Sequence, residues 1–289
     1  MGTGSGADDG GRKFQELKST LLAEITEGGF DEGTLLPSQR ELAAKHGVSR
    51  DTVQRVLAVL ADEGWIESRQ GRGSMVLRTQ TVRSSARGNF AARRLTLGPL
   101  IAAAFKASHV ALDVFTLTSE VLYTHVRAQE ELIRAGEIRP ATITIRMLVP
   151  SDDQPLPFPY ARGDRGDNRP QRHLRDIRRY HTDNLARRLQ ELDRDIDGLT
   201  AAVEIRRVPL VPYSKLYIFN EAEVVTGPYV PSERPITLDD GTTLDVVDVM
   251  GFDSTLTHWV KDADPHSQDS LIVSNWQRWF DSTWRLLAT

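Results

Sequence analysis

Arginine and glycine residues cluster at the tip of one predicted hairpin. Two short strand-like runs, residues 65–69 and 74–77, are joined by the sequence QGRG, in which Gly71 lies between Arg69 and Arg72. Glycine carries no side chain, so the backbone of such a tip is accessible, and guanidinium groups donate strong hydrogen bonds to phosphates. The tip is therefore predicted to be basic and able to approach an anionic surface closely.

Three amphipathic helices are predicted before this hairpin. Apolar residues recur at helical spacing over residues 13–27, 38–46 and 49–63. A capping box at Ser38 starts the second helix, and Gly47 suits the positive φ of a helix end. Three helices followed by a two-stranded hairpin predict a winged helix-turn-helix, whose third helix enters the major groove of DNA.

The sequence LLPSQRELAAKHGVSRDTVQRVLAVLADEGWIESRQGRGSMV resembles the DNA-binding domain of the GntR family of bacterial transcription regulators. The resemblance covers about 65 of the 289 residues, without gaps. It implies that duplex DNA is the partner. Carried over position by position, the DNA-contacting residues of the family are Arg40, Ser49, Arg50, Thr52, Gln54, Gln70 and Gly71, with Arg69 and Arg72 beside the wing glycine.

Side-chain chemistry suggests a role for each of these positions. Arg50, one position inside the third helix, suits a bidentate contact with guanine. The hydroxyls of Ser49 and Thr52 suit phosphates near a helix N-terminus, and Arg40 suits either phosphate or guanine. Gln54 stands where the family usually has a second arginine, so adenine is expected at the base it contacts. The alternative for any single arginine is a solvated surface charge.

Charge and composition divide the chain into four parts. Residues 1–11 are glycine-rich and predicted to be disordered, residues 12–78 form the winged helix-turn-helix domain, and residues 79–94 read as a basic linker. Residues 12–94 contain 14 Lys and Arg against 10 Asp and Glu, whereas residues 95–289 contain 22 against 28. A basic unit joined to a larger acidic one suggests a nucleic-acid binder with a separate partner domain.

The larger part alternates helix and strand patterns, which predicts an α/β effector-binding and dimerisation domain. Residues 150–170 form a long Pro-, Gly- and Arg-rich loop, which is typical of a lid, a binding segment or a disordered stretch. Four aromatic residues near the end of the chain share one helical face and are expected to pack in the core. They are Trp276, Trp279, Phe280 and Trp284.

The segment PYSKLYIFNEAEVVTGPY resembles a degenerate phospholipase D motif, H-x-K-x4-D, with Tyr213, Lys215 and Asn220 at the three motif positions. The resemblance implies a histidine nucleophile, which this chain lacks, and tyrosine is a poor replacement because it is protonated at neutral pH. The domain is therefore expected to be catalytically inactive. Lys215 is left as a candidate to bind a phosphate or carboxylate, together with Tyr213 and Asn220. In the alternative interpretation Lys215 merely begins an edge strand and Tyr213 packs nearby.

Cofactor and metal sites are not expected. The chain has no cysteine, and His173 and His181 are too far apart on one predicted helix to be adjacent ligands. His258 and His266 lie near two aspartates without convincing ligand spacing. No apolar run reaches the ~18 residues of a membrane span, so a cytoplasmic protein is expected.

Three classes of function are compatible with these patterns. The favoured one is a dimeric transcription regulator that binds a pseudo-palindromic operator and responds to a small, anionic effector at its larger domain. The second is a phosphodiesterase fused to a DNA-binding domain. The third is an architectural DNA-binding protein without a ligand.

Overall fold

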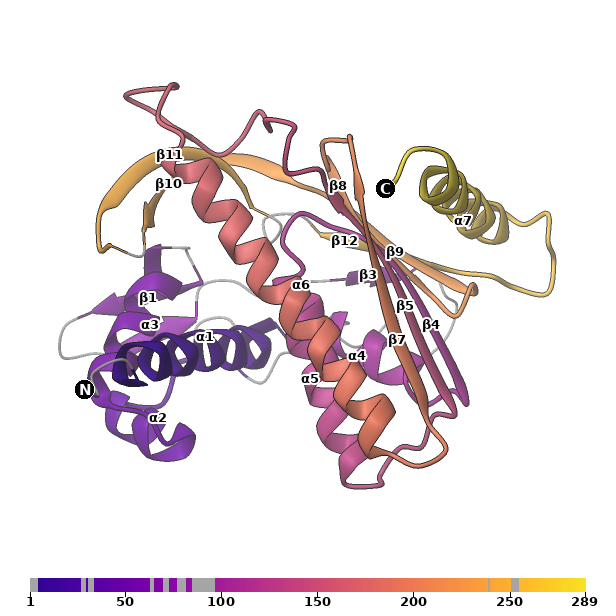
Figure 1. Cartoon of the computed structure of the whole chain (residues 1–289), viewed down its shortest axis with the longest axis horizontal. Helices are drawn as coiled ribbons and strands as arrows, with labels where there is room; N and C mark the ends of the chain where they lie inside the picture. The colour runs from indigo at the N-terminus through magenta and orange to yellow at the C-terminus, as the bar shows by residue number, and fades with distance from the viewer. Residues whose placement is uncertain are drawn as a thin grey trace. The chain divides into compact units, whose positions relative to one another are not determined.

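The computed structural model describes residues 5–26, 30, 34–62, 65–69, 73–76, 82–84, 97–238, 240–250 and 255–289. The chain forms two compact units, each of which is coloured by residue number in Figure 1. The smaller unit contains residues 1–79 and also residues 233–246, which the sequence places in the larger domain. The larger unit contains residues 80–232 and 247–289.

The smaller unit is a winged helix-turn-helix, as predicted. Its elements are α1 (Ser5–Thr26), α2 (Gln39–His46), α3 (Arg50–Asp62), β1 (Ile66–Arg69) and β2 (Gly73–Val76). The strands β1 and β2 pair in antiparallel fashion, with Arg69 opposite Gly73. Helix α1 begins inside the segment that was predicted to be disordered, and this differs from the sequence-based expectation.

Apolar side chains from all three helices make the core of the smaller unit. Leu21 and Ile25 of α1, Leu42 of α2 and Val53 of α3 are all fully buried. The wing is wider than the sequence predicts. Residues 34–36, which lie between the first two predicted helices, pair with β2: the Leu36 N–H donates to the Ser74 carbonyl at 2.8 Å, and the Val76 N–H donates to the Thr34 carbonyl at 2.9 Å.

The larger unit is built on a seven-stranded sheet with the strand order β3-β12-β9-β8-β4-β5-β7. Strands β4, β5 and β7 are mutually parallel, and β8 and β9 follow as an antiparallel hairpin. The elements after β2 are β3 (Val82–Ser84), α4 (Leu97–Ala104), β4 (His109–Phe115), α5 (Glu120–Arg134), β5 (Thr142–Pro150), β6 (Tyr160–Ala161), α6 (Arg169–Asp195), β7 (Thr200–Val208), β8 (Ser214–Phe219), β9 (Glu223–Pro228), β10 (Val230–Thr237), β11 (Thr243–Met250), β12 (Leu256–Val260) and α7 (Gln268–Leu286). Of these, β10 and β11 belong partly to the smaller unit, which includes residues 233–246.

Helices cover both faces of this sheet, so the larger unit is α/β, as predicted (Figure 1). Alternation along the strands separates the two faces. Tyr217 and Phe219 of β8 pack with α4, α5 and α6, whereas Leu216 and Ile218 pack with α7. The aromatic stripe of α7 is part of the second core, as expected, with Phe280 fully buried.

Three parts of the larger unit differ from the sequence-based expectation. Strand β3 lies in the stretch that was assigned to the linker, and it pairs in parallel with β12 at the sheet edge. The loop over residues 150–170 contains the short strand β6, which joins β10 and β11 in a second sheet. Strands β10, β11 and β12 were not predicted from the sequence.

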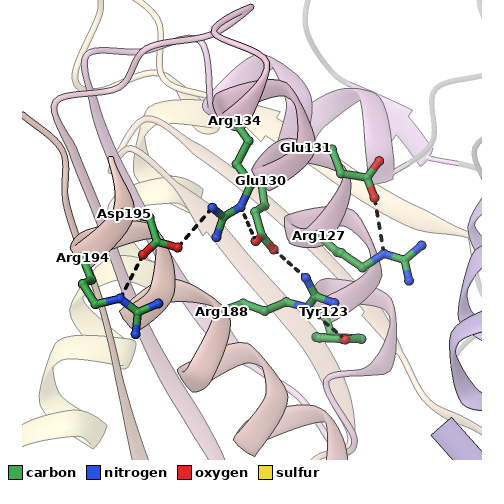
Figure 2. Close-up of polar contacts among 8 residues, drawn as sticks. All are labelled: Tyr123, Arg127, Glu130, Glu131, Arg134, Arg188, Arg194 and Asp195. Atoms are coloured by element: carbon green, nitrogen blue, oxygen red, sulfur yellow. Dashed lines mark hydrogen bonds and ion pairs between the residues drawn. The ribbon is translucent and has the colours of Figure 1, made fainter. Parts of the chain in front are cut away.

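A network of ion pairs joins α5 to α6 (Figure 2). Glu130, only 4% exposed, accepts hydrogen bonds from Arg134 Nε and Arg188 Nη1, both at 2.9 Å. Arg188 also donates to the Tyr123 hydroxyl at 3.2 Å, and Arg134 pairs with Asp195 at 3.2 Å. These contacts fix the two helices against each other on one face of the sheet.

Candidate nucleic-acid interface

Helix α2 is capped at both of its ends. At the start of α2, the Ser38 N–H donates to Glu41 Oε2 at 2.8 Å, and the Glu41 N–H donates to Ser38 Oγ at 3.3 Å. The side-chain and backbone hydrogen bonds from Ser38 hold the pKa of Glu41 below its ordinary value. Gly47 ends α2 in the left-handed region, with φ 63°. The capping box and the glycine end are therefore both confirmed.

Three of the four DNA-contacting candidates that lie within α2 and α3 are exposed. Arg40 on α2 and Arg50 and Gln54 on α3 are all exposed. Arg50 and Gln54 are four residues apart and therefore lie on one face of α3. Arg55 is exposed as well, but its guanidinium lies over the Phe14 ring, 5.0 Å from the centroid, so it is committed to α1.

The two hydroxyl candidates form the cap of α3. Ser49 Oγ accepts from the Thr52 N–H at 3.1 Å, and the two hydroxyl oxygens are 2.9 Å apart. Ser49 is exposed, so it can still meet a phosphate, whereas Thr52 is only 9% exposed. The structure thus gives Thr52 a part in helix capping that is separate from any contact with DNA.

The wing tip lies largely outside the described residues. Gln70, Gly71 and Arg72 are not described, and for Arg69 only the backbone is, at the end of β1 opposite Gly73. Gly73 has φ 87°, a conformation that favours glycine and starts the return strand. The described backbone therefore has the hairpin that the sequence predicts, and the contacts of its tip remain predictions.

A capped helix-turn-helix with exposed arginines and an antiparallel wing defines the class: this unit is a winged helix-turn-helix of the kind that binds DNA. A family profile for the bacterial regulatory proteins of the gntR family matches residues 13–76. These residues therefore constitute a GntR family DNA-binding domain.

Named relatives share this part of the chain. The HTH-type transcriptional regulator TreR of Bacillus subtilis is 34% identical over 88 residues, which are 30% of this chain and 37% of that protein. The Exu regulon transcriptional regulator of Escherichia coli is 33% identical over 78 residues, 27% of this chain and 30% of that protein. The chain thus spans about a third of the length of these two curated relatives.

A solved GntR family transcriptional regulator from Listeria monocytogenes is 31% identical, with a TM-score of 0.22, and the match covers 22% of this chain and 56% of that one. The matched family profile ends at residue 76 and does not reach the larger unit. Its resemblance to phospholipase D remains a prediction.

Lys215, the effector candidate of the larger unit, lies inside the sheet. It is 4% exposed in β8, which is a central strand, so the alternative that it begins an edge strand is wrong. Burial lowers the pKa of Lys215 to about 8, and the Glu120 carboxylate acts in the opposite direction. Its Nζ lies 5.7 Å from the centroid of the Tyr229 ring.

The other two effector candidates do not gather around Lys215. Tyr213 is 66% exposed. Asn220 follows the opposite end of β8, about 16 Å away at ~3.3 Å per strand residue. Its Oδ1 accepts from the Ala111 N–H at 2.8 Å, and its Nδ2 donates to the Ala104 carbonyl at 3.3 Å. Asn220 therefore holds a turn, and the structure does not bring the three candidates together.

Neither a metal-binding cluster nor a membrane-spanning helix is present among the described residues. Within this part of the chain, no three His, Cys, Asp or Glu side chains are grouped closely enough to hold a metal ion. Among the described helices, none combines the length and the apolar character needed to cross a membrane.

Proposed function

We propose that the chain is a transcription regulator that binds a pseudo-palindromic DNA operator as a homodimer. The observation that carries the proposal is the GntR family domain with Arg40, Arg50 and Gln54 exposed around a capped turn. In winged helix-turn-helix proteins, the first residues of the second helix of the motif reach the base edges. Here those residues belong to α3.

Arg50 and Gln54 are proposed to select the sequence. A guanidinium pairs with guanine O6 and N7, and a glutamine amide pairs with adenine N6 and N7. Arg40, Ser49, Thr52 and the wing residues 69–72 are proposed to position the domain on the phosphate backbone, which supports affinity without adding base preference. The operator half-site is therefore expected to contain guanine and adenine at neighbouring positions.

The larger α/β unit is proposed to dimerise the protein and to bind a small-molecule effector. A two-fold dimer places two DNA-binding domains on half-sites that repeat in steps of ~10 base pairs. An effector that favours one arrangement of the dimer needs a coupling of only ~1–3 kcal/mol to change operator occupancy. As a DNA-binding regulator of a bacterial type, the protein is proposed to act in the cytoplasm.

The test begins with selection of bound duplexes from a randomised library by the full-length protein. We expect a two-fold symmetric site. We then expect Arg50→Ala to weaken binding to this site by about 5- to 150-fold and to relax the preference for guanine, as measured by fluorescence anisotropy.

Arg55→Ala is the matched control for this test. Like Arg50→Ala, it removes one positive charge from an exposed position of α3, but the guanidinium of Arg55 lies over the Phe14 ring. Its base preference should equal that of the wild type. Equal losses of preference in both variants, or a wild-type protein that selects no sequence, would contradict the proposed function.

A further inference from the structure

A pocket of about 220 Å³ lies in the larger unit, between the segment after β5 and the first half of α6. Ser151, Asp152, Arg175 and Arg178 are among the residues that line it. Strand β5 is parallel to its neighbours β4 and β7, and the pocket lies beyond its carboxyl end. Ligands of α/β proteins commonly bind outside the carboxyl ends of parallel strands. The volume suits a ligand of a few non-hydrogen atoms, since a liquid water occupies ~30 Å³.

Guanidinium groups outnumber carboxylates around this pocket. Asp152 accepts from Arg178 at 2.5 Å, from Arg179 at 3.2 Å and pairs with Arg207 at 3.3 Å. Arg175 contributes a fourth guanidinium, whose Nη1 donates to the backbone carbonyl of Asp152 at 3.4 Å. The lining of the pocket holds two guanidinium groups, of Arg175 and Arg178, and two carboxylates, of Asp152 and Asp153. Arg179 and Arg207 pair with Asp152 from outside the lining, so the four guanidinium groups around Asp152 exceed the two carboxylates.

Arg178 is the strongest indication of a ligand. It is 3% exposed, and its Nη1 is buried without a hydrogen-bond acceptor in the described part of the chain. A buried donor on a charged group is costly when it is left without an acceptor. Burial lowers the pKa of Arg178, Asp152 raises it, and the positive charges of Arg207 and Arg175 lower it further.

The walls of the pocket are fixed in place by side chains of α6. Gln171 Nε2 donates to the carbonyls of Leu156 at 3.0 Å and Pro159 at 2.8 Å, and so ties the loop after β5 to the helix. Asn168, the N-cap residue of α6, also lines the pocket, and its side chain makes no capping hydrogen bond. A ligand thus meets a preformed site.

We propose that this pocket binds the oxyanion group, phosphate or carboxylate, of a small molecule, through Arg175 and Arg178. The planar fork of arginine suits both groups, because each offers two or more acceptor oxygens. Binding itself is independent of DNA. The regulatory use of the site, as the place where the effector acts, rests on the proposed function.

The test is calorimetric titration of the full-length protein at low ionic strength with inorganic phosphate and, separately, with malonate. We expect one saturable site per chain for at least one of these probes, and the probe that binds identifies the preferred oxyanion. Arg175→Gln should weaken binding by about tenfold or more, the loss expected for one hydrogen bond to a charged group. Arg178→Gln should weaken it further, but this variant also loses the pair with Asp152.

Arg187→Gln is the matched control. Arg187 is exposed on the same helix, donates to Asn184 at 2.6 Å and does not line the pocket. Its affinity for the probe should equal that of the wild type. No saturable binding of either probe, or an equal loss in Arg187→Gln and Arg175→Gln, would overturn the proposal. A wild-type protein that binds the probe but selects no DNA sequence would refute the proposed function and leave the anion site standing.

Discussion

Several charged side chains of this protein are buried away from water. Lys215 is the clearest case, because its ammonium group lies within the central sheet and burial lowers its pKa to about 8. Since the pKa is depressed in the folded state, the unfolded chain holds a proton between about pH 8 and 10.5 that the folded chain has released. Stability therefore rises with pH in this window.

We expect Lys215→Met to stabilise the protein at pH 7 by up to about 3 kcal/mol, because it removes the desolvation cost of a buried charge, which the Glu120 carboxylate offsets only in part. The advantage should shrink as the pH rises towards about 9.5, where the wild-type lysine is mostly neutral. Urea unfolding of the variant and the wild type at pH 7 and at about pH 9.5 measures this difference in the free energy of unfolding. Lys106→Met, at an exposed position, is the control and should show no such pH dependence. A constant difference between Lys215→Met and wild type would contradict the assigned pKa.

Local residue types were sufficient to predict the helix caps but not the anion pocket. Ser38, Glu41 and Gly47 act on neighbours within a few residues, so their spacing reveals the turn. Arg178 and Asp152 are 26 residues apart, and Arg207 belongs to a third element. Such contacts depend on the packing of α6 against the parallel strands, which short-range patterns do not specify.

At the scale of elements, the ion-pair network of Figure 2 makes α5 and α6 one structural block. Glu130 receives two guanidinium groups while nearly buried, so its loss leaves Arg134 and Arg188 without their shared acceptor. Glu131, one residue further, is 71% exposed in its side chain and contacts Arg127 at 3.9 Å. Glu130 and Glu131 are adjacent on α5 but differ in exposure, so substituting each in turn shows how much burial adds to the stabilising effect of an ion pair.

We expect Glu130→Ala to lower the free energy of unfolding by about 1–3 kcal/mol, because charged donors lose a buried acceptor. Glu131→Ala should change it by less than about 0.5 kcal/mol, as is usual for exposed pairs. Chemical denaturation at neutral pH measures the free energy of unfolding of both variants and of the wild type. Equal effects of the two substitutions would show that the network does not stabilise the helix pair.

The alternating sequence pattern predicted the α/β class of the larger unit but missed β3, β10, β11 and β12. The three-residue strand β3 is too short to show an alternating pattern. Strand β10 contains Pro231 and Pro235, and proline within a run argues against a strand. These strands form because neighbouring strands offer hydrogen-bond partners, as β12 does for β3.

For the whole molecule, the salt dependence of operator binding reports how many protomers contact DNA. Each phosphate contact contributes a slope of about −0.9 in log K against log salt concentration. If Arg40 contacts a phosphate, Arg40→Ala should reduce the slope by about 1.8 for a dimer and about 0.9 for a single protomer. The proposed homodimer predicts the larger value.

Lys45→Ala is the matched control for the salt titration. Lys45 lies on the same helix and is 53% exposed in its side chain, but its Nζ pairs with Glu24 at 2.5 Å. The slope of this variant should equal that of the wild type. A reduction near 0.9 in Arg40→Ala would indicate one bound protomer, and an unchanged slope would remove Arg40 from the phosphate contacts.

The smaller unit is discontinuous in sequence, because residues 233–246 belong to it together with residues 1–79. The chain therefore passes from one unit to the other three times, after residues 79, 232 and 246. A fragment that ends at residue 79 would lack residues 233–246, and with them a part of the compact unit that holds the DNA-binding helices.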